Sequence, residues 1–322
     1  MLRFKRLVIA LCLLASTNTL AAPQWHMPTP YPEGEHHTRN IVEFADDVRA
    51  ATGGELDIVV HSGASLYKHP EIHRAVRSGQ VPIGEMLMGL LGNDLPLFKV
   101  DNIPFLVTDF TAARRLWTVS RPELEKALDR QGLVLLFAVP WPPQGLYANR
   151  AVRSRADFAG RRMRAYSPLT ASLAAQLGAS PVNIQAPEIP QAFSTGVIEM
   201  MFTSPSTGVS SQAWDYTGYY INTRAWIPKN MVIANQRALR RLAEPQRTAL
   251  LAAAARAEKR GWQMAEQVTQ QDTLTLAGKG MEVLEPEAEL ERDLRAVGET
   301  LAAEWLQETG DAGRAILEEL RK

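Results

Sequence analysis

The feature that most constrains the fold is an alternation of helix-spaced and strand-like apolar patterns between about residues 40 and 235. Ile41, Phe44 and Val48 repeat at helical spacing before Gly53-Gly54, and an apolar run at 56–60 predicts a buried strand. The alternation then continues, with helices predicted at 70–76, 109–119, 122–128, 170–177 and 188–194, and strands at 81–86, 133–139, 162–166, 197–202 and 230–234. This alternation is typical of an α/β fold with a largely parallel sheet.

A single long helix is predicted after this region. An alanine-rich helical pattern runs from about 244 to 276 with Pro245 in its first turn, and a strand at 281–284 and two charged helices follow. With 322 residues, 46% of them apolar, the chain is large enough for two domains. Because no low-complexity linker separates them, strands or helices must cross between the domains. Such a chain is expected to hinge about a cleft.

The first 22 residues have the features of an export signal. Arg3, Lys5 and Arg6 precede an apolar run that is too short to span a bilayer, and small residues follow it. We expect cleavage near Ala21 or Ala22 and a periplasmic mature protein. Cleavage would remove Cys12, the one cysteine of the chain, and with it any disulfide or thiol chemistry.

Charge and motifs exclude several functions. The chain has 35 basic and 35 acidic residues, and loss of the signal would leave a net charge near −3, which argues against a nucleic-acid partner. The sequence contains no nucleophile elbow, phosphate loop or dinucleotide fingerprint. We therefore expect no catalytic residues, no cofactor and no enzymatic activity.

The segment 158–168 contains the residue best suited to bind an anion. It predicts a tight turn and a short strand in which Arg162, Arg164 and Tyr166 share one face. An arginine beside an aromatic ring suits a two-pronged hold on a carboxylate. On position alone, however, a surface arginine on an edge strand is the more common arrangement.

The histidines favour no metal site. All six fall in the first quarter of the chain: His26, His36, His37, His61, His69 and His73. His69 and His73 share one face of a predicted helix, but no acidic residue completes a zinc-helix pattern, and we expect no metal there. We expect His36-His37 to be a surface pair, with lining of the cleft as the alternative.

Aromatic residues gather where the chain would leave and re-enter the first domain. Most of them, including Tyr147 and Tyr220, are expected to pack in the core. Trp141 is different because it lies in the rigid loop PWPPQG (140–145) after a strand, where α/β folds place ligand contacts.

Three segments, taken in order, resemble the DctP-type solute-binding proteins of TRAP transporters. The segments are 140–149 followed by GRRMRAYSP (160–168), LGASPV (177–182) leading to STGVIE (194–199), and PKN (228–230) followed by EPQR (244–247). The resemblance covers essentially the whole mature chain. It implies a two-lobed, flytrap-like periplasmic-binding-protein fold (type II-like), in which strands are shared between the lobes and one long helix spans both.

The resemblance also implies roles for individual residues. Arg164 matches the family's arginine that pairs with the substrate carboxylate. Gln144 stands where members that bind sialic acid carry a second arginine, which suggests an acid read partly by neutral hydrogen bonds. Thr203 and Glu85 match polar positions that face the ligand in the family.

The remaining candidate site residues complete the predicted cleft. With Gln144 and Thr203, Asn230 is expected to orient the ligand by hydrogen bonds. Trp141, Tyr166 and Trp226 are expected to form its walls and exclude water. We place lobe I at 23–143 and about 229–270, and lobe II at 144–228 and about 271–322.

The function implied by this resemblance is capture of a small organic acid and its delivery to membrane permease subunits, one small and one large with many spans. We expect a monomer. The alternatives are a binding protein of another transporter, a sensory receptor, or an exported enzyme. The fold could serve sugar acids, aliphatic acids or aromatic acids.

Overall fold

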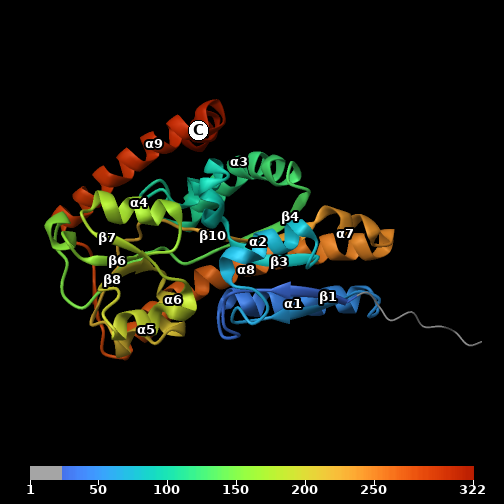
Figure 1. Ribbon diagram of the computed structural model, residues 1–322, viewed down its shortest axis with the longest axis horizontal. Coiled ribbons are helices and arrows are strands. Elements are labelled where there is room, and N and C mark those ends of the chain that lie inside the picture. The colour runs from blue at the N-terminus through green and yellow to red at the C-terminus, as the bar shows by residue number, and fades with distance from the viewer. Residues whose placement is uncertain (1–23) are drawn as a thin grey trace, which may run out of the picture.

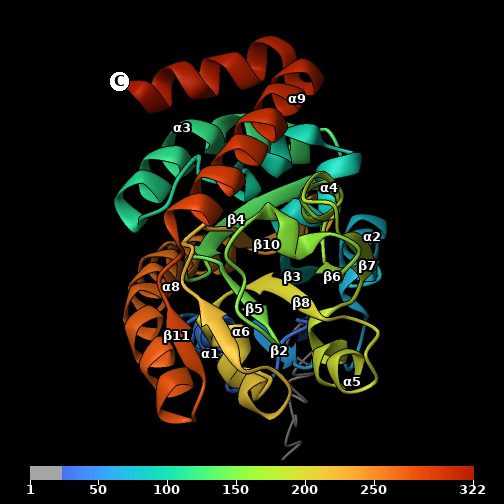
Figure 2. The same ribbon diagram turned by 90° about the vertical axis from the view of Figure 1, so that its left-hand side faces the viewer.

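The computed structural model describes residues 24–322 (Figures 1 and 2). The predicted export signal, its cleavage near Ala21 or Ala22, and Cys12 all lie outside the described residues. Within residues 24–322, no helix combines the length and apolar character that a membrane crossing requires.

One half of the molecule contains two small sheets. Strands β1 (Gln24–Pro28) and β2 (Asp57–His61) form a parallel pair. The second sheet is antiparallel, with the order β3 (Ile83–Leu87), β10 (Lys229–Asn235) and β4 (Leu133–Pro140). Helix α1 (His36–Ala51) packs against β2, and α2 (His69–Ser78) packs against β3. Helix α3 (Phe110–Asp129) packs against β4, and α7 (Gln236–Arg241) packs against β10.

The other half contains a six-stranded mixed sheet. Its order is β11 (Glu282–Leu284), β9 (Tyr219–Ile221), β5 (Gly145–Ala148), β8 (Met200–Thr203), β6 (Arg162–Ala165) and β7 (Ser180–Asn183). Strand β5 is antiparallel to β8 and β9, and the other neighbours are parallel. The helices of this half are α4 (Pro168–Gln176), α5 (Ile189–Ser194) and α6 (Pro205–Ser210).

Two extended segments cross between the halves side by side. One joins β4 to β5 and the other joins β9 to β10, and the backbones hydrogen-bond to each other. Trp141 N donates to the Pro228 carbonyl at 2.8 Å, Gln144 N to the Trp226 carbonyl at 2.9 Å, and Ala225 N to the Gln144 carbonyl at 2.9 Å. The connection between the halves is therefore a short antiparallel pair rather than a free linker.

Two long helices also contact both halves. Helix α8 (Glu244–Gly278) packs against α1 and β4 in one half and against α6 and β11 in the other, as expected for the predicted long helix. Helix α9 (Ala288–Arg321) packs against α3 and α4 and crosses one end of the molecule (Figure 2). The architecture is a two-lobed α/β fold.

The predicted helices and strands are largely confirmed, but the predicted parallel pairing is wrong for the sheet of β3, β10 and β4. Strand β10 enters from far along the chain, lies between β3 and β4, and pairs antiparallel to both. The helices predicted at 109–119 and 122–128 form the single helix α3, which contains Pro122. Burial of Leu116 and Leu124 on either side of the proline outweighs the one lost backbone hydrogen bond.

Helix α8 lies close against β4 at Gly261. A Cβ atom at this position would lie 2.4 Å from Val139 Cγ2 and 2.7 Å from Asn40 Nδ2. We expect Gly261→Ala to lower the free energy of unfolding by about 1–3 kcal/mol, because the helix must shift to relieve the overlap. Urea unfolding followed by circular dichroism measures this loss.

Gly278, near the end of the same helix, is the matched control. A Cβ atom there would meet nothing within 4 Å. Gly278→Ala is expected to leave stability unchanged or raise it, since alanine has the higher helix propensity. Equal losses for the two variants would contradict the close-packing explanation.

Candidate functional site

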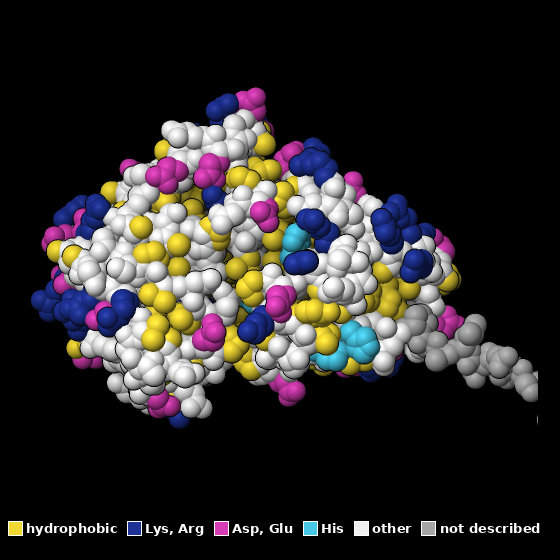
Figure 3. Space-filling view, viewed as in Figure 1, with side chains coloured by type: hydrophobic (Ala, Val, Ile, Leu, Met, Phe, Trp, Pro, Cys, Tyr) yellow, Lys and Arg dark blue, Asp and Glu magenta, His cyan; other side chains and the backbone are white. Residues whose placement is uncertain are grey.

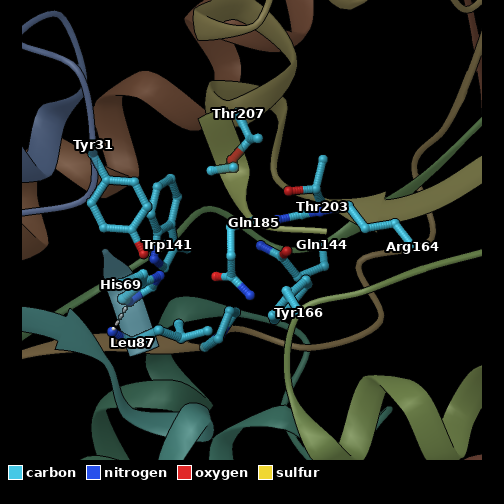
Figure 4. Close-up of a pocket in the computed structure, with 12 residues that line it drawn as sticks. Tyr31, His69, Leu87, Trp141, Gln144, Arg164, Tyr166, Gln185, Thr203 and Thr207 are labelled. Carbon is cyan, nitrogen blue, oxygen red and sulfur yellow. Dashed lines mark hydrogen bonds between the residues drawn. The ribbon is translucent and has the colours of Figure 1, made fainter. Parts of the chain in front are cut away.

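A cavity lies between the two halves, beside the crossing segments (Figure 4). Its walls come from both halves and from the crossing segments themselves. The lining residues are Tyr31, His69, Leu87, Trp141, Gln144, Arg164, Tyr166, Gln185, Ala186, Thr203, Thr207 and Pro228. Five of the eight predicted site residues are among them: Trp141, Gln144, Arg164, Tyr166 and Thr203.

Arg164 is buried in the cavity wall rather than exposed on an edge strand. It lies on β6 between β7 and β8, and only 5% of the residue is exposed. Its Nε donates to the Ile184 carbonyl at 2.9 Å, and its guanidinium lies 4.9 Å from the centre of the Tyr166 ring. These contacts fix the side chain and leave its end directed into the cavity (Figure 4).

The guanidinium has an unused hydrogen-bonding group. Nη1 is buried and has no hydrogen-bond partner. The neighbouring Arg161 and Arg162 both pair with Glu199, whereas no ion pair among residues 24–322 includes Arg164. Burial lowers the pKa of Arg164 to about 10, so the group still carries its positive charge at pH 7. A buried cation without a counter-ion is a site for an anion.

Trp141 is held in the wall by a hydrogen-bond network. Its Nε1 donates to Asn230 Oδ1 at 2.9 Å, and Tyr31 OH donates to the same oxygen at 3.3 Å. Asn230 Nδ2 in turn donates to Glu85 Oε1 at 3.1 Å, and Thr29 donates to Glu85 Oε2 at 2.5 Å. Burial raises the pKa of Glu85, and these two donors oppose the rise.

Asn230 and Glu85 therefore lie behind the aromatic wall, outside the set that lines the cavity. Trp226 has a similar place: it is fully buried, does not line the cavity, and donates from Nε1 to Tyr166 OH at 3.2 Å. In this structure these three residues position Trp141, Tyr31 and Tyr166.

Gln144 and Thr203 lie at the junction of the crossing segment and the six-stranded sheet. Gln144 Nε2 donates to the Pro142 carbonyl at 2.9 Å, which orients the amide. Thr203 ends β8, directly opposite Gly145 in the sheet register. Both are buried and line the cavity, which places neutral polar groups close to the guanidinium of Arg164 (Figure 4).

The histidine predictions need one correction. His36 and His37 are each only 1% exposed and are therefore not a surface pair. His36 Nδ1 contacts Glu35 Oε1 at 2.8 Å, and the ring of His37 lies 4.3 Å from that of Trp141. The first turn of α1 faces the interior behind Trp141, and this buries both rings.

His69 and His73 have separate partners. Leu87 N donates to His69 Nε2 at 3.0 Å, and His73 Nε2 contacts Gln131 Oε1 at 2.7 Å. Across residues 24–322 no cluster of three or more metal-binding side chains occurs.

Sequence reasoning missed seven lining residues: Tyr31, His69, Leu87, Gln185, Ala186, Thr207 and Pro228. Two of them carried a usable signal. Tyr31 lies between Pro30 and Pro32, the same rigid aromatic setting that singled out Trp141. The other is His69, which shares one face of a predicted helix with His73, a pattern that suggests a metal site more readily than contact with an organic ligand.

A cleft between two α/β lobes that contains a buried, unpaired cation defines a receptor for a small anionic solute. The comparison with family models agrees: residues 29–308 match the model for bacterial extracellular solute-binding proteins, family 7 (DctP). The chain belongs to this family, the solute-binding proteins of TRAP transporters.

Three solved structures are similar over nearly the whole chain. The Bordetella pertussis receptor DctP7 is 48% identical, covering 94% of this chain and 100% of that chain, with a TM-score of 0.92. The receptor DctP6 of the same organism is 40% identical, covering 93% of this chain and 99% of its own, with a TM-score of 0.92. A solute-binding protein from an unidentified marine microbe is 36% identical, with the same coverage and TM-score as DctP6.

These three proteins share a ligand. Both Bordetella receptors are described as binding pyroglutamic acid, and the marine protein was solved with co-purified pyroglutamate.

Proposed function

We propose that this protein is a receptor for pyroglutamate, which it captures between its lobes. The observation that carries the proposal is the buried, unpartnered Nη1 of Arg164 in the cleft, which calls for an anionic ligand. Pyroglutamate supplies one carboxylate on a compact ring. The ring suits a space bounded by Tyr31, Trp141 and Tyr166. The three similar receptors support this choice of acid.

In this proposal the crossing segments act as the hinge. Lobe I comprises 23–143 and about 229–270, and lobe II comprises 144–228 and about 271–322. A ligand that touches both lobes favours the closed state by its higher affinity for that state. The closed form of the monomer then delivers the acid to one small and one large membrane subunit. Residues 1–22 direct export to the periplasm, and the ligand is released chemically unchanged.

The first test is thermal unfolding of the purified protein with and without pyroglutamate. At a concentration one hundred times the dissociation constant, a ligand that binds only the folded state adds about 2.7 kcal/mol of stability. We expect a rise of several degrees in the melting temperature, with a 1:1 stoichiometry by calorimetry. Chromatography of the bound acid after incubation should recover it intact.

Pyroglutamamide is the matched control, because it keeps the ring and replaces the carboxylate with a neutral amide. It should give no shift, and glucuronate should give little, since a sugar acid exposes hydroxyl groups to the aromatic walls. An unchanged melting temperature with pyroglutamate would overturn the choice of acid.

A further inference from the structure

The cavity has a second polar side, opposite the cation. Figure 4 shows the Arg164 guanidinium and Thr203 on one side, Tyr31 and His69 on the other, and the Gln185 amide between them. Both His69 and Gln185 line the cavity, and only 5% of His69 is exposed. A ligand whose carboxylate meets Arg164 therefore turns its remaining polar groups toward His69 and Gln185.

A backbone contact fixes the tautomer of His69. Its Nε2 lies 3.0 Å from Leu87 N, and a backbone N–H can only donate. Nε2 is therefore the acceptor, and in the neutral ring the proton is on Nδ1. The ring is neutral at pH 7 because burial lowers its pKa to about 4, with Arg164 acting in the same direction and Glu85 and Gln185 opposing. His69 thus has one N–H donor, whose partner in this structure is the side chain of Gln185.

The donor lies beside the amide of Gln185, which contributes a carbonyl oxygen as acceptor. One donor and one acceptor side by side match a ring amide, whose C=O and N–H lie on the same edge. Both groups are neutral, so they discriminate by hydrogen bonding and not by charge. His69 and Gln185 hydrogen-bond each other in this structure, so a ring without the amide leaves them only that one bond, whereas a ring amide gives each of them a bond to the ligand.

We propose that His69 is a specificity-determining residue, whose Nδ1–H donates to the amide carbonyl oxygen of the bound acid. This inference rests on the proposed function, because it assumes a ligand with a carboxylate at one end and a ring amide at the other. Arg164 then supplies attraction for any small acid, and His69 selects among acids of the same size and charge.

The test compares two ligands on the full-length mature protein by calorimetry. Pyroglutamate and cyclopentanecarboxylate have the same ring size and charge, and only the first has the amide. We expect the wild type to prefer pyroglutamate and His69→Phe to reduce that preference about tenfold or more. The affinity for cyclopentanecarboxylate should change little between the wild type and His69→Phe, because the imidazole and phenyl side chains present rings of similar size to the apolar edge of this ligand.

A merely structural role of His69 would weaken both ligands equally, and an unchanged preference would overturn the assignment. His69→Asn, which returns an N–H donor near the place of Nδ1, should restore part of the preference, and failure to do so would count against it. If His69→Phe does not fold, the preference for pyroglutamate over cyclopentanecarboxylate is measured on His69→Ala instead. A wild type that binds cyclopentanecarboxylate as tightly as pyroglutamate overturns the His69 assignment, whereas one that binds neither overturns the proposed function and, with it, this inference.

Discussion

Replacing Arg164 with methionine is expected to abolish acid binding and to leave the empty protein at least as stable as the wild type. Loss of one partner of a buried, hydrogen-bonded charge pair costs about 2–5 kcal/mol, roughly a 30-fold to several thousand-fold loss of affinity. In the empty protein the same charge is buried with Nη1 unpartnered, so its removal relieves a cost. Calorimetry with pyroglutamate and urea unfolding without it measure the two effects.

Arg162→Met is the matched control, since Arg162 lies on the same strand but is exposed and contacts Glu199. It should bind pyroglutamate like the wild type. Arg164→Lys keeps the charge but loses the planar fork, and an intermediate affinity is expected. If Arg164→Met still gains full thermal stabilisation from pyroglutamate, the acid binds elsewhere.

Of the substitutions proposed here, Lys229→Met is expected to lower the free energy of unfolding the most. Lys229 and Asp101 are each 1% exposed, and Lys229 Nζ lies 3.5 Å from Asp101 Oδ2. Removing one member of such a pair leaves an uncompensated buried charge and costs about 3–5 kcal/mol. Burial already raises the pKa of Asp101, although Lys229 opposes the rise, and loss of Lys229 should raise it further.

The destabilisation should therefore depend on pH. A carboxyl group whose pKa is higher in the folded state binds its proton more readily there, so the variant loses stability as pH rises above the usual range for aspartate. Chemical unfolding at pH 4.5 and pH 7 should show the smaller loss at pH 4.5.

A second substitution should recover stability. Asp101→Asn in the Lys229→Met background removes the charge and keeps an acceptor for the Lys229 backbone N–H, which donates to Asp101 Oδ2 at 2.8 Å. Lys126→Met, at an exposed pair with Glu123, is the surface control and should change stability by less than about 1 kcal/mol. A Lys229→Met variant as stable as this control would show that the buried pair contributes nothing.

Local patterns predicted most of the elements, because each depends on residues close in sequence. Gly79 ends α2 in the left-handed conformation, and Pro245 occupies the first turn of α8, as the sequence indicates. Strand pairing is different. The position of β10 between β3 and β4 depends on contacts between residues at least 89 positions apart in sequence, and no local pattern carries that information.

The residues of the candidate site also differ in whether the sequence alone could predict them. Arg164 could be predicted because a charged residue on a short strand stands out, and the family resemblance gave it a role. Gln185 and Ala186 follow a short, half-polar strand and become lining residues only when the lobes are placed together. Glu85, Asn230 and Trp226 were predicted to face the ligand, but they lie one layer further out, since a sequence pattern does not give depth within a wall.

The paired crossing segments have a consequence for how this receptor can evolve. Trp141, Gln144 and Pro228 line the cavity and also take part in the backbone pairing that joins the halves. Because we propose these segments as the hinge, we expect a substitution there to alter selectivity and lobe motion together. Gln185 and Ala186 lie outside this pairing. We therefore expect substitutions in the loop after β7 to change solute preference without disturbing the backbone pairing that joins the two halves.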